Sequence, residues 1–301
     1  MQHFSQNDSP IEPPSYEKVL AAGFNQNVDP GNRNRAVHPG IGIQGVEFHR
    51  DQCPPGWQPS KAEFERDEDG VVSYDPSLQE NADELWNFFL THLEDRPMIN
   101  INVHGYHYET HYYRDSKGNR HSRRVQVTDF RISIDVTDHV QPWRVVVADS
   151  WNKSGKQQSF QEILQEYTSS DNKLKQIVLH KWLDWDTDTL RQAIVNLISS
   201  GGGFNDHIDV SIVIDPTRVE VHSDSVASKM ADNCCVRTLC VITCLCIIAW
   251  PIYSLTRKKI DDKIVAHYPM AIPEGEFYNR NALLIINAVR SRSHNAAWAS
   301  P

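Results

Sequence analysis

TLCVITCLCIIAWPIYSLT, residues 238–256, holds no charged residue over its 19 positions. Arg237 precedes it, and Arg257, Lys258 and Lys259 follow it. As a single helix rising about 1.5 Å per residue it would extend roughly 28 Å, close to the roughly 30 Å apolar thickness of a bilayer. A buried helix of a globular core is the alternative, but such helices are usually shorter and have a polar face, which this stretch lacks. We therefore predict one membrane helix over these residues.

Two signals in the sequence predict opposite orientations of the membrane segment. Lys and Arg are more frequent after the segment than before it, which favours a cytosolic C-terminus. A docking motif in the N-terminal tail, described below, favours a cytosolic N-terminus instead. The proline of Trp250-Pro251 permits a bend, and a shallow hairpin would leave both flanks cytosolic. We expect a single-pass or hairpin segment in an endomembrane rather than the plasma membrane, with the main domain in the cytosol.

The chain as a whole is acidic, with a formal net charge of −9 and a pI near 5.8. This balance argues against a nucleic-acid partner, which would require a basic surface for phosphates. With 301 residues, 40% of them hydrophobic, the chain is long enough for one substantial domain with tails. The N-terminus lacks a basic region followed by an apolar one, so we predict no cleaved signal peptide.

Five of the six cysteines lie in or beside the apolar stretch, which argues against a disulfide framework for a distant domain. Cys234, Cys235 and Cys240 stand at the start of this stretch, where thiols are candidate S-palmitoylation sites. Alternatively, these cysteines are small apolar residues packed in a helix. The sequence favours neither interpretation.

Residues 1–78 form a tail rich in Pro, Asn, Gln, Asp and Gly, without a sustained hydrophobic period. We predict a disordered tail with a short helix after Tyr16. Its sharpest motif is PPSY, a PPxY pattern. Pro13 and Pro14 favour a polyproline II conformation, and Tyr16 fits the adjoining pocket of a WW domain. The motif predicts a WW-domain partner, such as a cytosolic ubiquitin ligase.

Residues 79–225 have the pattern of an α+β domain. Asn81 as a cap, acids in the following turn and one apolar face predict a helix that Pro97 ends. Residues 99–114 and 123–138 predict a long β-hairpin closed by residues 116–119, and the alternation slips at Gly105 as in a bulge. Further elements are expected at 145–147, 159–167, 176–185, 187–199, 208–214 and 218–222.

The C-terminal part, residues 257–301, is expected to add a strand over 263–268 and an amphipathic helix over 276–290. The predicted apolar stripe of that helix contains Phe277, Leu284, Ile285 and Ala288. We therefore predict an α+β fold with a mainly antiparallel sheet, a long hairpin and flanking helices, plus one C-terminal membrane helix.

The first strand of the hairpin carries weak candidates for a metal site. His107, Glu109 and His111 share one face of a strand, so two imidazoles and a carboxylate point the same way. The segment is also full of Tyr, and no fourth ligand is predictable. We therefore favour an exposed polar face over a metal site, and expect no cofactor.

Several short segments between residues 80 and 290 resemble a widespread family of fungal proteins with a late membrane segment and no assigned activity. They are Glu80–Trp86 with Phe88-Phe89, Val103-His104-Gly105, Val127–Phe130, Trp250-Pro251, Tyr268-Pro269 and Ala288-Val289. The resemblance implies the architecture above and no catalytic residues. The cysteines are more numerous here than in that pattern, which leaves their role open.

Three functions follow as hypotheses. The leading one is a membrane-tethered, non-enzymatic domain that recruits a WW-domain protein and links ubiquitin ligation to membrane traffic. The second is a lipid-binding domain held at its membrane, which requires an apolar pocket open toward the bilayer. The third is a metal-dependent enzyme on the His-rich hairpin.

Overall fold

The computed structural model describes residues 15–16, 18, 45–49, 58–67, 70–94, 96–141, 143–148, 150, 158–244 and 246–301. Its strands are β1 (Gly45–His49), β2 (Glu65–Arg66), β3 (Gly70–Ser73), β4 (Met98–Arg114), β5 (Arg120–Asp135), β6 (Trp143–Ala148), β7 (Lys175–Leu183), β8 (His207–Asp215), β9 (Arg218–His222), β10 (Lys258–Tyr268) and β11 (Ala296–Ala299). Its helices are α2 (Ser77–Glu80), α3 (Ala82–Glu94), α4 (Phe160–Thr168), α5 (Thr187–Leu197), α6 (Val226–Asp232), α7 (Cys234–Ile242), α8 (Cys246–Thr256) and α9 (Glu274–Arg290).

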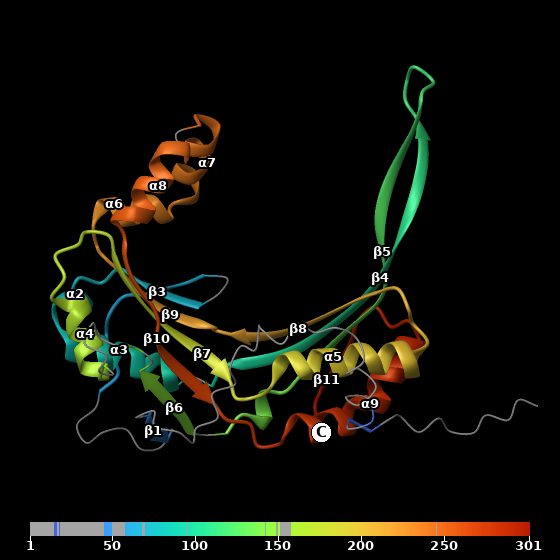
Figure 1. The fold of residues 1–301 in the computed structure, drawn as a ribbon, viewed down its shortest axis with the longest axis horizontal. Coiled ribbons are helices and arrows are strands. Elements are labelled where there is room, and N and C mark those ends of the chain that lie inside the picture. The colour runs from blue at the N-terminus through green and yellow to red at the C-terminus, as the bar shows by residue number, and fades with distance from the viewer. Residues whose placement is uncertain are drawn as a thin grey trace, which may run out of the picture.

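Two mixed sheets form the body of the molecule (Figure 1). The larger sheet has the strand order β1-β6-β10-β7-β9-β3-β2, and the smaller has the order β11-β5-β4-β8. The pairs β10–β7, β3–β9 and β11–β5 are parallel, and the others are antiparallel. The α+β class is therefore confirmed: among the described strands six of the nine pairs are antiparallel, and both sheets are mixed because each also contains a parallel pairing.

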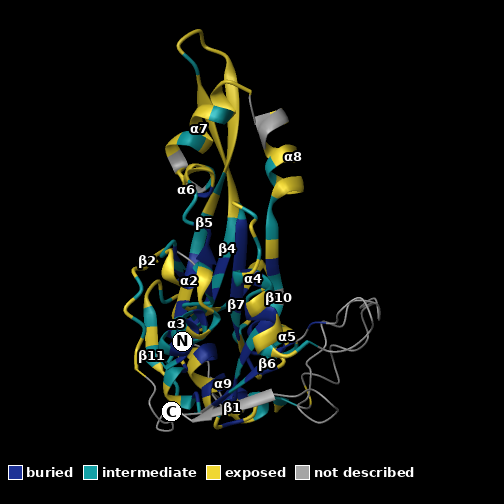
Figure 2. Ribbon diagram, turned by 90° about the vertical axis from the view of Figure 1, so that its left-hand side faces the viewer, coloured by how far each residue is buried: buried dark blue, intermediate teal, exposed yellow. Residues whose placement is uncertain are grey.

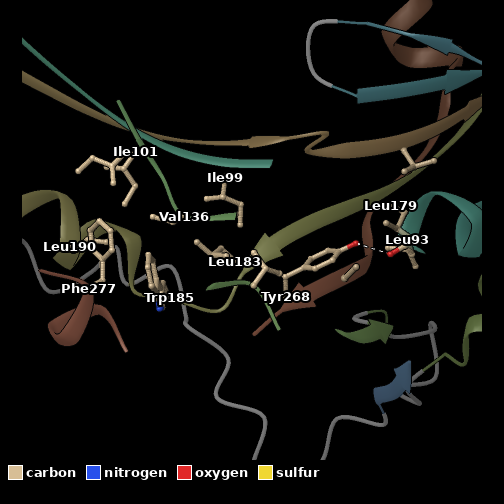
Figure 3. Packing of buried hydrophobic residues seen from close by; sticks show 14 of the residues in the cluster. Leu93, Ile99, Ile101, Val136, Leu179, Leu183, Trp185, Leu190, Tyr268 and Phe277 are labelled. Carbon is tan, nitrogen blue, oxygen red and sulfur yellow. Dashed lines mark hydrogen bonds between the residues drawn. The ribbon is translucent and has the colours of Figure 1, made fainter. Parts of the chain in front are cut away.

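One hydrophobic core runs beneath both sheets (Figure 3). Helices α2, α3 and α4 cover the larger sheet, and α5 and α9 cover the smaller one (Figure 1). Tyr268 of β10 is buried and donates its hydroxyl to the carbonyl of Leu93 at 3.3 Å. Trp185 donates its indole N–H to the carbonyl of Ile272 at 2.9 Å. Each buried ring therefore also satisfies a backbone acceptor.

Buried lysines satisfy the C-terminal ends of three helices. The Lys175 ammonium donates to the carbonyls of Gln79 in α2 and of Tyr167 and Thr168 in α4, at 3.1, 3.2 and 3.4 Å. Lys181 donates to the carbonyl of His92 in α3 at 2.8 Å. A cation at this end complements the helix dipole and pairs carbonyls that lack an intrahelical donor.

The predicted local signals hold where the structure describes them. Asn81 caps α3 by accepting from the N–H groups of Asp83 and Glu84, at 2.9 and 3.3 Å. Ser159 and Glu162 form a complete capping box at α4. Gly203, with a φ of +71°, follows the π-helical turn Ile198–Gly202 that extends α5.

The long hairpin and its bulge are also confirmed. Gly105 pairs with Phe130 and Tyr106 with Thr128, so Asp129 is the extra residue of the bulge. A Cβ atom at position 105 would lie 2.1 Å from the ring of Phe130. Only glycine therefore lets β4 pass over this buried ring.

Three expectations need correction. The ordered body begins before residue 79, because β3 pairs in parallel with β9 and Val71 is buried; the 1–78 tail had no pattern that revealed this strand. Leu284 is exposed, and α9 buries Tyr278, Asn281, Ala282, Ile286 and Val289 beside Phe277, Ile285 and Ala288. Most of residues 1–57 of the predicted disordered tail lie outside the described residues, so disorder there stays a prediction.

The predicted membrane helix over 238–256 is the third correction. The stretch forms two short helices, α7 and α8, which reverse at Thr243-Cys244. Among the described residues, no helix combines the length and the apolarity needed to cross a bilayer. The turn lies earlier than the bend expected at Trp250-Pro251, and Pro251 stays inside α8.

Two projections leave the body on the same side (Figures 1 and 2). One consists of α6, α7 and α8, and the other is the outer part of the β4–β5 hairpin. Both are largely exposed, in contrast to the buried strands beneath them (Figure 2). We call residues 234–256 the helical hairpin and residues 106–128 the arm.

Candidate functional site: the helical hairpin

The helical hairpin is fastened to the body at both ends. The side-chain oxygen of Asn233 caps α7 by accepting from the N–H groups of Cys235 and Val236, at 2.9 and 3.3 Å. Ser225, the cap of α6, donates its hydroxyl to the carbonyl of Lys173. At the other end the Asn172 amide donates to the carbonyl of Thr256 at 2.8 Å, and β10 follows directly.

Large apolar side chains cover the hairpin on the outside. The exposed ones are Leu239, Val241, Ile242, Ile247, Trp250, Ile252 and Leu255. Leu255 is 86% exposed, and Ile242 and Ile247 are 73% and 72% exposed. Scattered apolar residues are normal on a protein surface, but seven large ones on two short helices are a candidate contact surface for a partner or a membrane.

Several polar groups at the turn form hydrogen bonds within the hairpin. At the turn, the N–H groups of Thr243 and Cys244 donate to the carbonyls of Leu239 and Val241, at 3.0 and 3.1 Å. Thr243 also donates its hydroxyl to Leu239 at 2.8 Å. Cys244 has a φ of +55°, the left-handed conformation that reverses the chain. Such internal pairing is what an apolar solvent demands of a backbone.

Two cations, one in the hairpin and one directly after it, lie over aromatic rings of α8. The Arg237 guanidinium lies over the ring of Trp250 at 5.9 Å, and that of Arg257 lies over Tyr253 at 5.5 Å. In contrast, Lys259 pairs with Asp261 of the body. Trp, Tyr and Arg are the residues that lie at the level of lipid headgroups.

The length of the hairpin matches half a bilayer. The nine residues of α7 and the 11 of α8 give helices roughly 13 and 16 Å long at about 1.5 Å per residue. The apolar thickness of a bilayer is about 30 Å. The hairpin therefore has the reach of one leaflet.

The candidate lipidation sites lie at the start of this hairpin. Cys235 is exposed in the first turn of α7, and Cys240 is half-buried one turn and a half later. Cys234 begins α7, but its side chain lies outside the described residues. Cys244, at the turn, is exposed as well.

The PPxY motif is only partly within the described residues, because Pro13 and Pro14 lie outside them. Tyr16 is half-buried against α9, with its ring 5.3 Å from that of Tyr278 and its N–H 3.4 Å from the Asn279 side-chain oxygen. Burial, with the nearby carboxylates of Glu274 and Asp186, raises the pKa of Tyr16 to about 12. The tyrosine of the motif is thus engaged by the body.

The three weak metal candidates lie together on the arm. Glu109 sits between two imidazoles, 3.4 Å from Nε2 of His107 and 3.2 Å from Nε2 of His111. Nδ1 of His107 lies 2.6 Å from Asp129, and these hydrogen bonds raise the pKa of His107. Within the described residues, no group of three or more His, Cys, Asp or Glu side chains is placed to hold a metal ion.

Sequence reasoning missed two features of these projections. The helix break at Thr243-Cys244 has no proline or glycine to signal it. The basic and aromatic character of the arm is local to residues 112–124, so the acidic net charge of the whole chain does not reveal it.

Comparisons of the chain with protein families, curated proteins and solved structures gave no match. The resemblance to a fungal family stays a prediction.

Proposed function

We propose that this protein is a monotopic, membrane-tethered and non-enzymatic platform whose helical hairpin inserts into one leaflet. The observation that carries the proposal is the set of seven large apolar side chains exposed on a projection that no part of the described body covers. The N–H groups of Thr243 and Cys244 at the turn donate to carbonyls within the hairpin, which lowers the cost of moving them into lipid. S-acylation of Cys235 would add a second anchor beside the first.

The platform is proposed to hold a protein partner through the PPxY motif. A WW domain takes up the tyrosine of such a motif in a pocket. Since Tyr16 packs on Tyr278, recruitment requires that this contact opens. Tyr16→Ala is expected to abolish capture of a WW domain, and unchanged capture would remove this part of the proposal.

Flotation with phosphatidylcholine vesicles tests the membrane anchor. Fully burying a Leu or Ile is worth about 1.5–3 kcal/mol, so each exposed residue on the hairpin contributes roughly 1–2 kcal/mol in lipid. The double variant Leu239→Ser/Ile247→Ser should lose about 2–4 kcal/mol, or roughly 30- to 1000-fold in partitioning. The matched control is Leu283→Ser/Leu284→Ser on α9, where both leucines are also exposed.

The wild type and the α9 variant are expected to float with the vesicles, and the hairpin variant to stay behind. Flotation of the hairpin variant at the wild-type level would overturn the proposal. So would extraction of the intact protein from cell membranes by alkaline carbonate.

A further inference from the structure

The arm is a two-stranded ribbon that leaves the core at the Gly105 bulge. Up to this residue, alternate side chains of β4 are buried; from Glu109 to Tyr113, all are exposed. Tyr112 is 79% exposed. An isolated ribbon of this length gains little stability from its own contacts. We therefore expect a ribbon that projects this far from the core to contact another surface.

The strand register sorts the arm into two faces. One face carries Tyr106, Tyr108, Tyr112, Arg114, Arg120 and Arg124, and the other carries His107, Glu109, His111, Tyr113, His121 and Arg123. Within residues 106–128, all of which the structure describes, the first face has no carboxylate. Arg124 lies over the ring of Tyr108 at 4.1 Å. Aromatic rings and guanidinium groups are thus interspersed along this face, with two arginines paired at the tip.

The arm is basic although the chain is acidic. Residues 106–128 hold five Arg or Lys and two acids, whereas the whole chain has a net charge of −9. Both acids are engaged within the arm. Glu109 lies between two histidines, and Asp115 accepts from His121, Asn119 and Lys117, which lower its pKa to about 2. The two acids therefore do not neutralise the arginines near the tip, and these guanidinium groups can bind an external anion.

We propose that the arm is a second membrane contact, whose tip binds anionic lipid headgroups through Arg114 and Arg120 of the first face, Arg123 of the other face and the tyrosines near the tip. The inference rests on the proposed function, because the helical hairpin supplies the first anchor. Both projections leave the same side of the body, the arm reaching farther than the helical hairpin (Figures 1 and 2), so both can approach the same membrane. Tyr and Arg suit the headgroup layer, and clustered cations bind anionic lipid.

The same chemistry would also suit single-stranded nucleic acid, where bases stack on aromatic rings beside a basic groove. The common direction of the arm and the apolar hairpin favours lipid. Binding to a single-stranded oligonucleotide is therefore measured alongside lipid binding in the test.

The test is flotation of the full chain with vesicles of phosphatidylcholine alone and of phosphatidylcholine mixed with phosphatidylserine. The arm variant is Arg120→Gln/Arg123→Gln, which avoids the Arg124–Tyr108 contact. The matched control is Lys61→Gln/Arg66→Gln, which removes two exposed cations from the body. At roughly fivefold per cation, the arm variant should bind the mixed vesicles about 30-fold more weakly than the wild type.

The arm variant and the control should both bind pure phosphatidylcholine as the wild type does, and the control should keep wild-type binding to the mixed vesicles. Equal binding of the arm variant and the wild type to mixed vesicles would overturn the inference while leaving the hairpin anchor standing. The inference would also be overturned if the arm variant failed to bind either vesicle type. The same holds if the wild type bound a single-stranded oligonucleotide more tightly than the mixed vesicles. Failure of the anchor itself shows instead in the Leu239→Ser/Ile247→Ser variant.

Discussion

Gly105→Ala is expected to destabilise the body at the base of the arm. The added Cβ atom would meet three ring atoms of Phe130 at 2.1, 2.3 and 2.7 Å. Since carbon atoms rest about 3.5 Å apart, the ring must withdraw by roughly 1.4 Å. Phe130 is fully buried with its ring centroid 5.1 Å from that of Phe204, which leaves it little room.

The magnitude follows from two opposing effects. Overpacking of a core typically costs about 1–3 kcal/mol, and three ring contacts place this site at the upper end. Replacing glycine by alanine in a strand returns roughly 0.5–1 kcal/mol. The net loss in the free energy of unfolding should be about 2 kcal/mol. Urea unfolding followed by circular dichroism in a mild detergent measures it.

A second substitution separates this clash from a general loss of strand structure. Phe130→Leu removes the ring, so it should rescue Gly105→Ala, with a coupling energy of at least about 1 kcal/mol. The control is Gly118→Ala in the hairpin turn, where a Cβ would meet open space but φ is +84°. It should cost about 1 kcal/mol from backbone strain alone, without rescue by Phe130→Leu. A Gly105→Ala variant as stable as the wild type, or additive effects with Phe130→Leu, would refute the reasoning.

Three further predictions concern buried polar groups and the docked tyrosine. Lys175→Met should cost about 2–4 kcal/mol because three helix-end carbonyls lose their donor, whereas Lys173→Met, at an exposed position, should change thermal unfolding little. Burial alone would raise the pKa of Glu220, but its hydrogen bond with His222 at 2.7 Å helps lower it overall. The carboxylate therefore stabilises the fold above its unfolded pKa of about 4.3, and this stability is lost as the pH falls through the lower folded pKa; Glu220→Gln should remove that part of the acid dependence in unfolding midpoints measured against pH. A peptide of residues 11–20 should bind a WW domain about fivefold more tightly than the full chain does in calorimetry, because Tyr16 must first leave α9; equal affinities would show that this contact does not compete.

Elements encoded by nearby residues were predictable from the sequence. The Asn81 cap, the Ser159 capping box and the slip at Gly105 each depend on a few neighbouring positions, and the structure contains all three. A hairpin also pairs residues close in sequence, so its register follows from its turn. Local signals therefore gave α3, α4, α5, α9 and the long ribbon.

Long-range pairing was not predictable in the same way. β3 and β11 are four residues long, and each pairs in parallel with a strand far away in the sequence. Strands this short have no period to recognise, and their partners were not inferred from the sequence. The docking of Tyr16 on α9 is of the same kind, because it joins residues more than 250 positions apart.

The position of β10 explains why the apolar stretch takes the form of a hairpin. β10 follows α8 directly and lies between β6 and β7, where Val265 pairs with Val147 on one side and His180 on the other. A single helix across a bilayer would carry β10 to the opposite side from both neighbours and break the larger sheet at its centre. Buried strand N–H and C=O groups left unpaired would each cost about 1–3 kcal/mol. The sheet therefore requires the chain to return to the side it left, and a reversal at Thr243-Cys244 provides that return.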